Sequence, residues 1–217
     1  MAHRIRVKVC CIQNQDEANL AVSKGVDALG LVGPMPSGPG VISNETIHKI
    51  SRAISPPTAT FLLTSETTAS GILQHHQKVR TSVIQLVDEV DQKDLVSLRE
   101  ELPGIKLVQV IHVSGSESIE AALEVSNYID ALLLDSGNPN LDIKELGGTG
   151  RTHDWEISRA IVERSSKPVF LAGGLNPDNV SRAIDFVRPF GVDVCSGLRR
   201  GGKLDSALLD SFLQAIG

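Results

Sequence analysis

Short runs of β-branched and other apolar residues alternate with longer amphipathic stretches along the whole 217-residue chain. The runs predict strands at residues 4–10, 28–32, 58–63, 82–86, 106–112, 131–135, 169–172 and 191–195. The stretches have the period of helices and cover residues 15–24, 44–54, 68–78, 93–102, 117–125, 154–165, 177–188 and 204–216. This alternation indicates a parallel sheet whose strands are joined by crossover helices. Eight such units predict an α/β chain with a single (β/α)8 TIM-barrel domain over residues 1–217.

A doubly wound open sheet is the alternative architecture. Such a sheet usually carries a Gly-rich turn directly after its first strand. Here that position reads Cys10-Cys11-Ile12-Gln13-Asn14, which contains no glycine. The sequence therefore favours the barrel.

Composition excludes several classes of partner. The net charge is −5, and no basic cluster is interleaved with aromatic residues, which argues against nucleic-acid binding. No apolar run approaches the roughly 18 residues of a membrane helix, and the first residues lack the apolar region of a signal peptide. Neither the three cysteines nor the histidines have metal-ligand spacing, and His75 and His76 are expected on a solvated helix surface. We expect a cytoplasmic monomer or homodimer without a metal, a nucleic-acid partner or a membrane contact.

The first strand places a thiol at the mouth of the predicted barrel. One of its faces carries Ile5, Val7, Val9 and Cys11, and this apolar face should meet the helices. Lys8 and Cys10 then point inward, with Cys10 at the carboxyl end, whereas Cys11 is expected to be structural. Asp135 ends the sixth strand at the same mouth, so a thiolate and a carboxylic acid form a candidate base and acid pair. Taken singly, Cys10 also fits a small buried apolar residue and Asp135 a turn residue.

Glycines after the seventh and eighth strands suggest an anion site. Gly173 and Gly174 end the seventh strand and lead to Asn176-Pro177, which is typical of a helix start. The amino end of a helix offers free amides to a phosphate, and Ser196-Gly197 follows the eighth strand in the equivalent place. Loops after these two strands are the frequent phosphate site of the fold. Ordinary tight-turn chemistry is the alternative.

A further glycine-rich stretch, Gly147-Gly148-Thr149-Gly150-Arg151-Thr152, follows the sixth strand. It is not a nucleotide-binding P-loop, because the first glycine of that motif would fall at Glu145 and Arg151 replaces the lysine. Gly148 and Gly150 can expose backbone amides to an anion, and a flexible loop is the alternative.

Five segments together resemble the phosphoribosylanthranilate isomerase family. They are Lys8-Val9-Cys10, Leu132-Leu133-Leu134-Asp135-Ser136, residues 147–155, residues 171–180 and residues 188–197. The resemblance spans the chain and is most specific from Asp135 to Gly197. It implies a single eight-stranded barrel of tryptophan biosynthesis that performs an Amadori rearrangement on a small phosphosugar substrate without a cofactor.

The resemblance also implies roles for individual residues. Asp135 resembles the general acid that protonates the ribose ring oxygen, and Cys10 resembles the general base that takes the proton from C2. A thiol must be partly ionised to act in this way, and the inward-pointing Lys8 favours the thiolate. Asp193 resembles the carboxylate that orients the anthranilate amine. The phosphate cradle would comprise Gly148, Gly150, Gly173, Gly174, Ser196 and Gly197.

The chain departs from the family pattern around the aromatic half of the substrate. Cys11 stands in place of a glycine, and Ser37-Gly38-Pro39-Gly40 lacks the arginine that would grip the anthranilate carboxylate. The family's Gln-Leu-His-Gly becomes Gln85-Leu86-Val87-Asp88. Either the substrate is a different phosphoribosyl amine, or another residue does the arginine's work. Arg199 and Arg200, which follow Ser196-Gly197, are the candidates, with a solvated pair as the alternative. A catalytically silent phosphosugar-binding barrel is a third hypothesis, although binding alone requires neither Cys10 nor Asp135.

Overall fold

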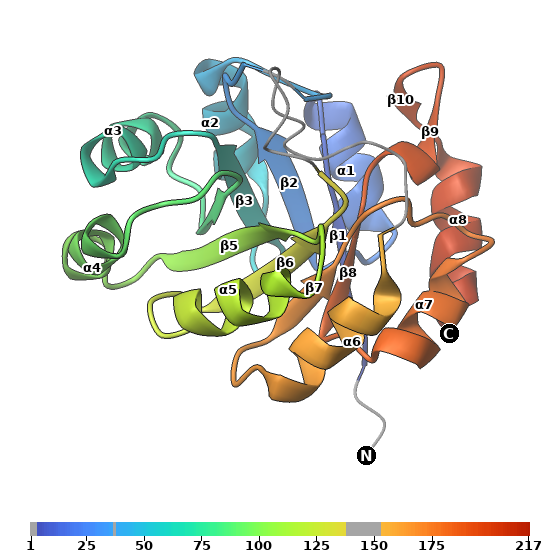
Figure 1. Cartoon of the computed structure of the whole chain (residues 1–217). Helices are drawn as coiled ribbons and strands as arrows, with labels where there is room; N and C mark the ends of the chain where they lie inside the picture. Colours follow the sequence, from blue (N-terminus) through green and yellow to red (C-terminus); the bar gives the residue numbers. More distant parts are fainter. Residues whose placement is uncertain (1–3, 37, 138–152) are drawn as a thin grey trace.

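A closed barrel of parallel strands forms the centre of the computed structural model, which describes residues 4–36, 38–137 and 153–217 (Figure 1). The strands follow one another around the barrel in chain order: β1 (Arg6–Val9), β2 (Ala28–Val32), β3 (Ala59–Thr64), β4 (Val83–Leu86), β5 (Lys106–His112), β6 (Ala131–Asp135), β7 (Val169–Leu171) and β8 (Gly191–Val194). The last strand pairs with the first, with Lys8 opposite Asp193. The (β/α)8 barrel is thereby confirmed, since an open sheet would leave both edges unpaired.

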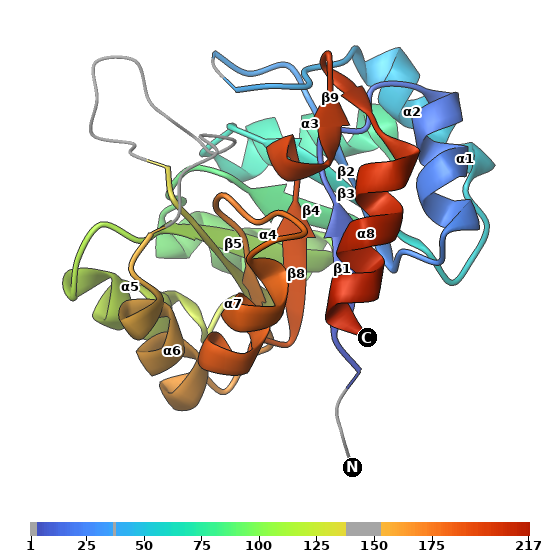
Figure 2. The ribbon, with the colours of Figure 1, turned by 90° about the vertical axis from the view of Figure 1, so that its right-hand side faces the viewer.

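Eight helices of the described chain surround this barrel (Figures 1 and 2). They are α1 (Gln15–Ser23), α2 (Asn44–Ala53), α3 (Ala69–Val79), α4 (Gln92–Glu101), α5 (Glu117–Val125), α6 (Trp155–Arg164), α7 (Val180–Val187) and α8 (Ser206–Ile216). Lys24, directly after α1, forms a 2.8 Å ion pair with Asp210 of α8. This contact joins the last helix to the first.

Alternate residues of the strands face two separate apolar cores. Val7 and Val9 belong to the core between barrel and helices, as the alternation in β1 predicts. The barrel interior is filled by a second cluster that includes Phe61, Leu133 and Phe170. Phe61 and Phe170 meet edge to face, with ring centres 6.2 Å apart. Lys8 is wholly buried within this interior, which confirms its inward direction.

Two expected helix starts are wrong. Helix α7 begins at Val180 and not at residue 177, because Asn176 accepts a hydrogen bond from Asp178 N at 2.9 Å and donates from its own N to Asn179 Oδ1. These side-chain bonds hold a turn before the helix. Helix α8 begins at Ser206 because a short hairpin, β9 (Arg199–Arg200) and β10 (Lys203–Leu204), precedes it.

His75 and His76 are buried, so the expectation of a solvated pair on α3 is also wrong. The His75 ring contacts Thr64 Oγ1 at 2.8 Å and Asn44 Oδ1 at 3.0 Å. His76 donates from Nε2 to the carbonyl of Thr81 at 2.8 Å. Both histidines fasten α3 to its neighbours.

Candidate active site

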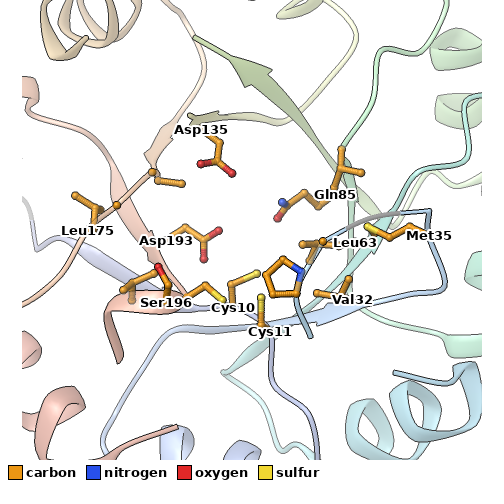
Figure 3. Close-up of a pocket in the computed structure, with 18 residues that line it drawn as sticks. Cys10, Cys11, Val32, Met35, Leu63, Gln85, Asp135, Leu175, Asp193 and Ser196 are labelled. Atoms are coloured by element: carbon orange, nitrogen blue, oxygen red, sulfur yellow. The ribbon is translucent and has the colours of Figure 1, made fainter. Parts of the chain in front are cut away.

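A cavity opens at the mouth of the barrel, where the strands end (Figure 3). It comprises about 640 Å³, part of which is open solvent. Loops after β1, β2, β4, β7 and β8 contribute to its wall, and Asp135 contributes from the last position of β6. The sequence-predicted residues that line it are Cys10, Asp135, Gly173, Gly174, Asp193 and Ser196.

Cys10 and Asp135 lie on opposite sides of this cavity (Figure 3). Cys10 follows β1 directly, is 6% exposed, and donates from its backbone N to Val194 O at 2.8 Å. Asp135 ends β6, where its Oδ1 accepts a hydrogen bond from Ser136 N at 2.7 Å. The barrel thus brings a thiol and a carboxyl group to one space, as the strand pattern predicts.

A buried ion pair supports the floor of the cavity. Lys8 Nζ lies 2.8 Å from Asp193 Oδ2, and it also stands 5.3 Å from the centre of the Phe61 ring. Burial alone would lower the pKa of Lys8, but the charge of Asp193, the hydrogen bond to it and the nearby Cys10 and Cys11 together outweigh burial and raise that pKa, so Lys8 is protonated. Among the described residues, none is hydrogen-bonded to the second oxygen of Asp193, Oδ1, although this atom is buried. Asp193 is one of the residues that line the cavity.

The Lys8 ammonium also lies close to the Cys10 sulfur. A Cβ built on Gly30 would meet Cys10 Sγ at 2.8 Å and Lys8 Nζ at 3.1 Å. Both atoms therefore lie where a side chain at position 30 would begin, and the space exists only because residue 30 is a glycine.

Cys11 corrects the expected pattern, because its side chain lines the cavity and does not face the helices. Strand β1 ends at Val9, and Cys11 adopts a φ of 61°, in the left-handed region. This turn of the backbone breaks the alternation of faces. Hydrogen bonds to the sulfurs of Cys10 and Cys195, together with burial, raise the pKa of the Cys11 thiol.

The loops after β7 and β8 pack closely against each other, and their conformation requires glycines. Gly173 and Gly174 have φ values of 83° and 63°, a conformation that side chains disfavour. At Gly197, a Cβ would come within 2.1 Å of Leu175 O, so the two loops touch there. Ser196 begins a 3-10 turn, η1 (Ser196–Leu198), at the cavity wall. The other predicted phosphate contacts, Gly148 and Gly150, lie outside the described residues.

Arg199 and Arg200 do not line the cavity. Arg199 donates to both oxygens of Glu17 at 3.2 Å, to Gly202 O at 2.9 Å and to the carbonyl of Cys11. Arg200 is exposed, with its Nε 3.5 Å from Asp205. The guanidinium of Arg199 therefore ties the loops after β1 and β8 together.

Gln85 is a pocket residue to which sequence reasoning gave no role. It is 3% exposed and lines the cavity, and its Oε1 has no hydrogen-bond partner within the described structure. The alternation of β4 could have found it, since Val83 and Val87 face the barrel interior and Gln85 lies between them.

Over the same described residues, no three His, Cys, Asp or Glu side chains are arranged to hold a metal ion. None of the described helices has the length and apolar character needed to cross a membrane.

A closed parallel barrel with a thiol and two carboxyl groups around a cavity at its carboxyl-terminal mouth defines a (β/α)8-barrel enzyme. The model of the N-(5'-phosphoribosyl)anthranilate isomerase family matches residues 7–215. The chain belongs to this family.

Individual relatives agree with that assignment over nearly their full length. The chain is 32% identical over 212 residues to the N-(5'-phosphoribosyl)anthranilate isomerase of Methanocella arvoryzae, covering 97% of each chain. It is 37% identical over 212 residues to the enzyme of Halobacterium salinarum, covering 96% of this chain and 94% of the other. A solved phosphoribosylanthranilate isomerase, in complex with reduced 1-(o-carboxyphenylamino)-1-deoxyribulose 5-phosphate, superposes with a TM-score of 0.81 at 30% identity and 98% coverage of both chains.

Proposed function

We propose that this chain catalyses the Amadori rearrangement of N-(5'-phosphoribosyl)anthranilate to the carboxyphenylamino-deoxyribulose phosphate. The placement of Cys10 and Asp135 across one cavity is the observation that carries the proposal. Family membership supports it, as does the reduced reaction product bound to a solved relative. The rearrangement moves protons and bonding electrons within one molecule and consumes no second substrate.

The two side chains act in sequence on the sugar. Asp135 protonates the ring oxygen, the bond from C1 to that oxygen breaks, and the nitrogen lone pair forms a C1–N double bond. The Cys10 thiolate then removes the proton from C2, the freed electron pair forms a C1–C2 double bond, and the nitrogen becomes neutral. Tautomerisation of this enol gives the ketone. General acid and base groups placed in this way typically contribute about 10²–10⁴-fold each.

The remaining cavity residues bind and orient the substrate. Asp193 Oδ1, buried and without a partner in the described structure, accepts a hydrogen bond from the anthranilate nitrogen. Backbone amides of the loops that carry Gly173, Gly174, Ser196 and Gly197 hold the phosphate. Lys8 keeps Asp193 in place and lies beside the Cys10 sulfur.

A direct assay follows the loss of phosphoribosylanthranilate fluorescence. Cys10→Ser and Asp135→Asn should each lower kcat by about 10²–10⁴-fold while leaving the fold intact, because each removes one proton-transfer group. Asp16→Asn, a change of an exposed carboxyl group in α1, is the matched control and should keep wild-type turnover. Wild-type kcat in either active-site variant would refute the assignment.

One observation favours a second candidate function. Pro39 lines the cavity at the position where the family resemblance implies an arginine, with Met35 and Gly38 beside it. This arrangement fits the same rearrangement on a phosphoribosyl amine that lacks the anthranilate carboxylate. Comparing kcat/KM for phosphoribosylanthranilate and for the analogue without the carboxylate separates the two: a much higher value for the analogue would favour the second candidate.

We expect the reaction to take place in the cytoplasm, because the three cysteines are free and a reducing compartment keeps thiols in that state. We expect the chain to act as a monomer or a homodimer, which sedimentation of the purified protein distinguishes.

A further inference from the structure

All three cysteines of the chain converge on the cavity. Cys10, Cys11 and Cys195 are free thiols, and each of them lines the same wall. The mechanism uses only Cys10. The other two thiols therefore need their own explanation.

The pairing of β1 with β8 brings these thiols together. Val9 lies opposite Val194, so the next residues along the two strands, Cys10 and Cys195, leave the barrel side by side. The left-handed turn at Cys11 then places its sulfur beside both of them, in hydrogen-bond contact with each.

Cys195 is the most exposed of the three thiols. It is half-buried, whereas Cys10 and Cys11 are buried, so a small oxidant reaches it first. The hydrogen bond with Cys11 lowers the pKa of the Cys195 thiol, and the charge of Arg199 adds to this effect. A partly exposed thiolate beside a guanidinium is typical of oxidation-sensitive cysteines.

We propose that Cys195 and Cys11 form a modification site, in which a peroxide converts the two thiols into a disulfide beside Cys10 and thereby inactivates the enzyme. The Cys195 sulfur attacks one oxygen of hydrogen peroxide, the O–O bond breaks, and the products are the sulfenic acid of Cys195 and water. The Cys11 sulfur then attacks the sulfenic sulfur, the S–O bond breaks, and a second water leaves with the proton of Cys11. The two cysteines lose two electrons, which reduce the peroxide. A dithiol reverses the reaction by exchange.

Cys11, and not Cys10, is the partner of Cys195. Cys11 shares a hydrogen bond with Cys195, whereas Cys10 is not among the groups that shift the pKa of Cys195. A bond between the adjacent Cys10 and Cys11 would close a strained small ring, which excludes that pairing as well. Once Cys11 is oxidised it no longer offers a thiol proton to Cys10, and its sulfur is drawn toward β8. Both changes disturb the proposed base, so activity falls.

The experiment treats the purified full chain with hydrogen peroxide and follows isomerase activity and peptide masses together. In the wild type we expect activity to fall at least 10-fold, a peptide pair linked through Cys11 and Cys195, and recovery with dithiothreitol. Cys195→Ser should form no such link, and relative to its own untreated activity it should be inactivated at least 10-fold more slowly. Cys11→Ser should instead accumulate a sulfenic acid on Cys195 that dimedone traps.

Three results would overturn the proposal. They are a wild-type chain that loses activity without the Cys11–Cys195 link, a link that contains Cys10, and a Cys195→Ser variant inactivated as fast as the wild type. The peptide masses need only the wild-type chain, so the test remains decisive if a variant fails to fold. The link is also measured without substrate, so its absence is distinguishable from a failure of the proposed isomerase function.

Discussion

Lys8 donates a hydrogen bond to Asp193 at 2.8 Å inside the barrel, where both side chains are buried. The two residues stand opposite each other in the pairing of β1 with β8. Their contact therefore forms only when the first and last strands meet. Asp193 lines the cavity and Lys8 lies beside the Cys10 sulfur. The contact that forms when the barrel closes therefore also supports the floor of the active site.

Replacing Lys8 with Met should lower the free energy of unfolding by about 3–5 kcal/mol, since removal of one partner leaves a buried charge uncompensated. Urea denaturation followed by circular dichroism measures the change. A double variant, Lys8→Met with Asp193→Leu, removes both charges and should recover most of the lost stability. A single variant within about 1 kcal/mol of the wild type would show that Asp193 does not depend on this pair.

A Gly197→Ala substitution should raise the KM for the phosphosugar more than it lowers kcat. The added methyl group would lie 2.1 Å from Leu175 O, so the loops after β7 and β8 must separate. Competition by inorganic phosphate reports on the same loops and should weaken in parallel.

Gly104→Ala is the matched control for that substitution, because a Cβ at Gly104 meets no atom within 4 Å. It should leave both KM and phosphate inhibition unchanged. If Gly197→Ala also leaves phosphate inhibition unchanged, these loops do not hold the phosphate.

Local sequence patterns predicted those parts of the site that lie on regular strands. The period of two in β1 places Lys8 inside the barrel, and the last residue of β6 places Asp135 at its mouth. These positions follow from chain geometry alone, because alternate side chains of a strand must face opposite sides.

Cys11 was mispredicted because its direction depends on distant contacts. Its position lies beyond the end of β1, where the alternation no longer applies, and its backbone carbonyl is held by Arg199. A Cβ on Gly40 would come within 2.5 Å of the Cys11 Cβ, so the loop after β2 accommodates this side chain only with a glycine there. A local pattern contains no information on contacts between residues so far apart in sequence.

Glu17 should make stability sensitive to acid. Burial alone would raise its pKa, but hydrogen bonds from Arg199 and from the backbone N of Leu204 and of Gln13 outweigh it and lower the pKa. A carboxyl group with a lowered pKa in the folded state contributes stability above its unfolded pKa, near 4.5, and this contribution is lost as the pH falls through the folded pKa. Chemical denaturation at a series of pH values from about 6 to about 3 should show a shallower decline for Glu17→Gln than for the wild type.

The matched control for this pH series is Glu45→Gln, which removes an exposed carboxyl group paired with Lys49. Exposed pairs of this kind contribute little to stability, so its decline should follow the wild type. A Glu17→Gln profile parallel to that of the wild type would show that Glu17 is not a site of acid sensitivity.

Arg199 and Arg200 are neighbours in sequence, but they should differ in their contribution to the free energy of unfolding. Arg199 is held by Glu17, Gly202 O and Cys11 O, so Arg199→Met should lower the free energy of unfolding by about 1.5–3 kcal/mol, the value of hydrogen bonds to a charged group. Arg200 is exposed, and Arg200→Met should stay within about 0.5 kcal/mol of the wild type. The same denaturation assay measures both.

Substrate selectivity decides whether either arginine grips a carboxylate. Because neither guanidinium lines the cavity, we expect each Met variant to change kcat/KM by the same factor for phosphoribosylanthranilate and for the analogue without its carboxylate. A charge-assisted hydrogen bond to that carboxylate would be worth roughly 10- to 100-fold in affinity. A loss of this size confined to the carboxylate-bearing substrate would show that the arginine swings into the cavity when substrate binds. Equal losses of kcat/KM on both substrates, with lower stability for Arg199→Met alone, would show that Arg199 acts by holding the loops after β1 and β8 together. Carboxylate recognition would then have to come from other residues around the cavity.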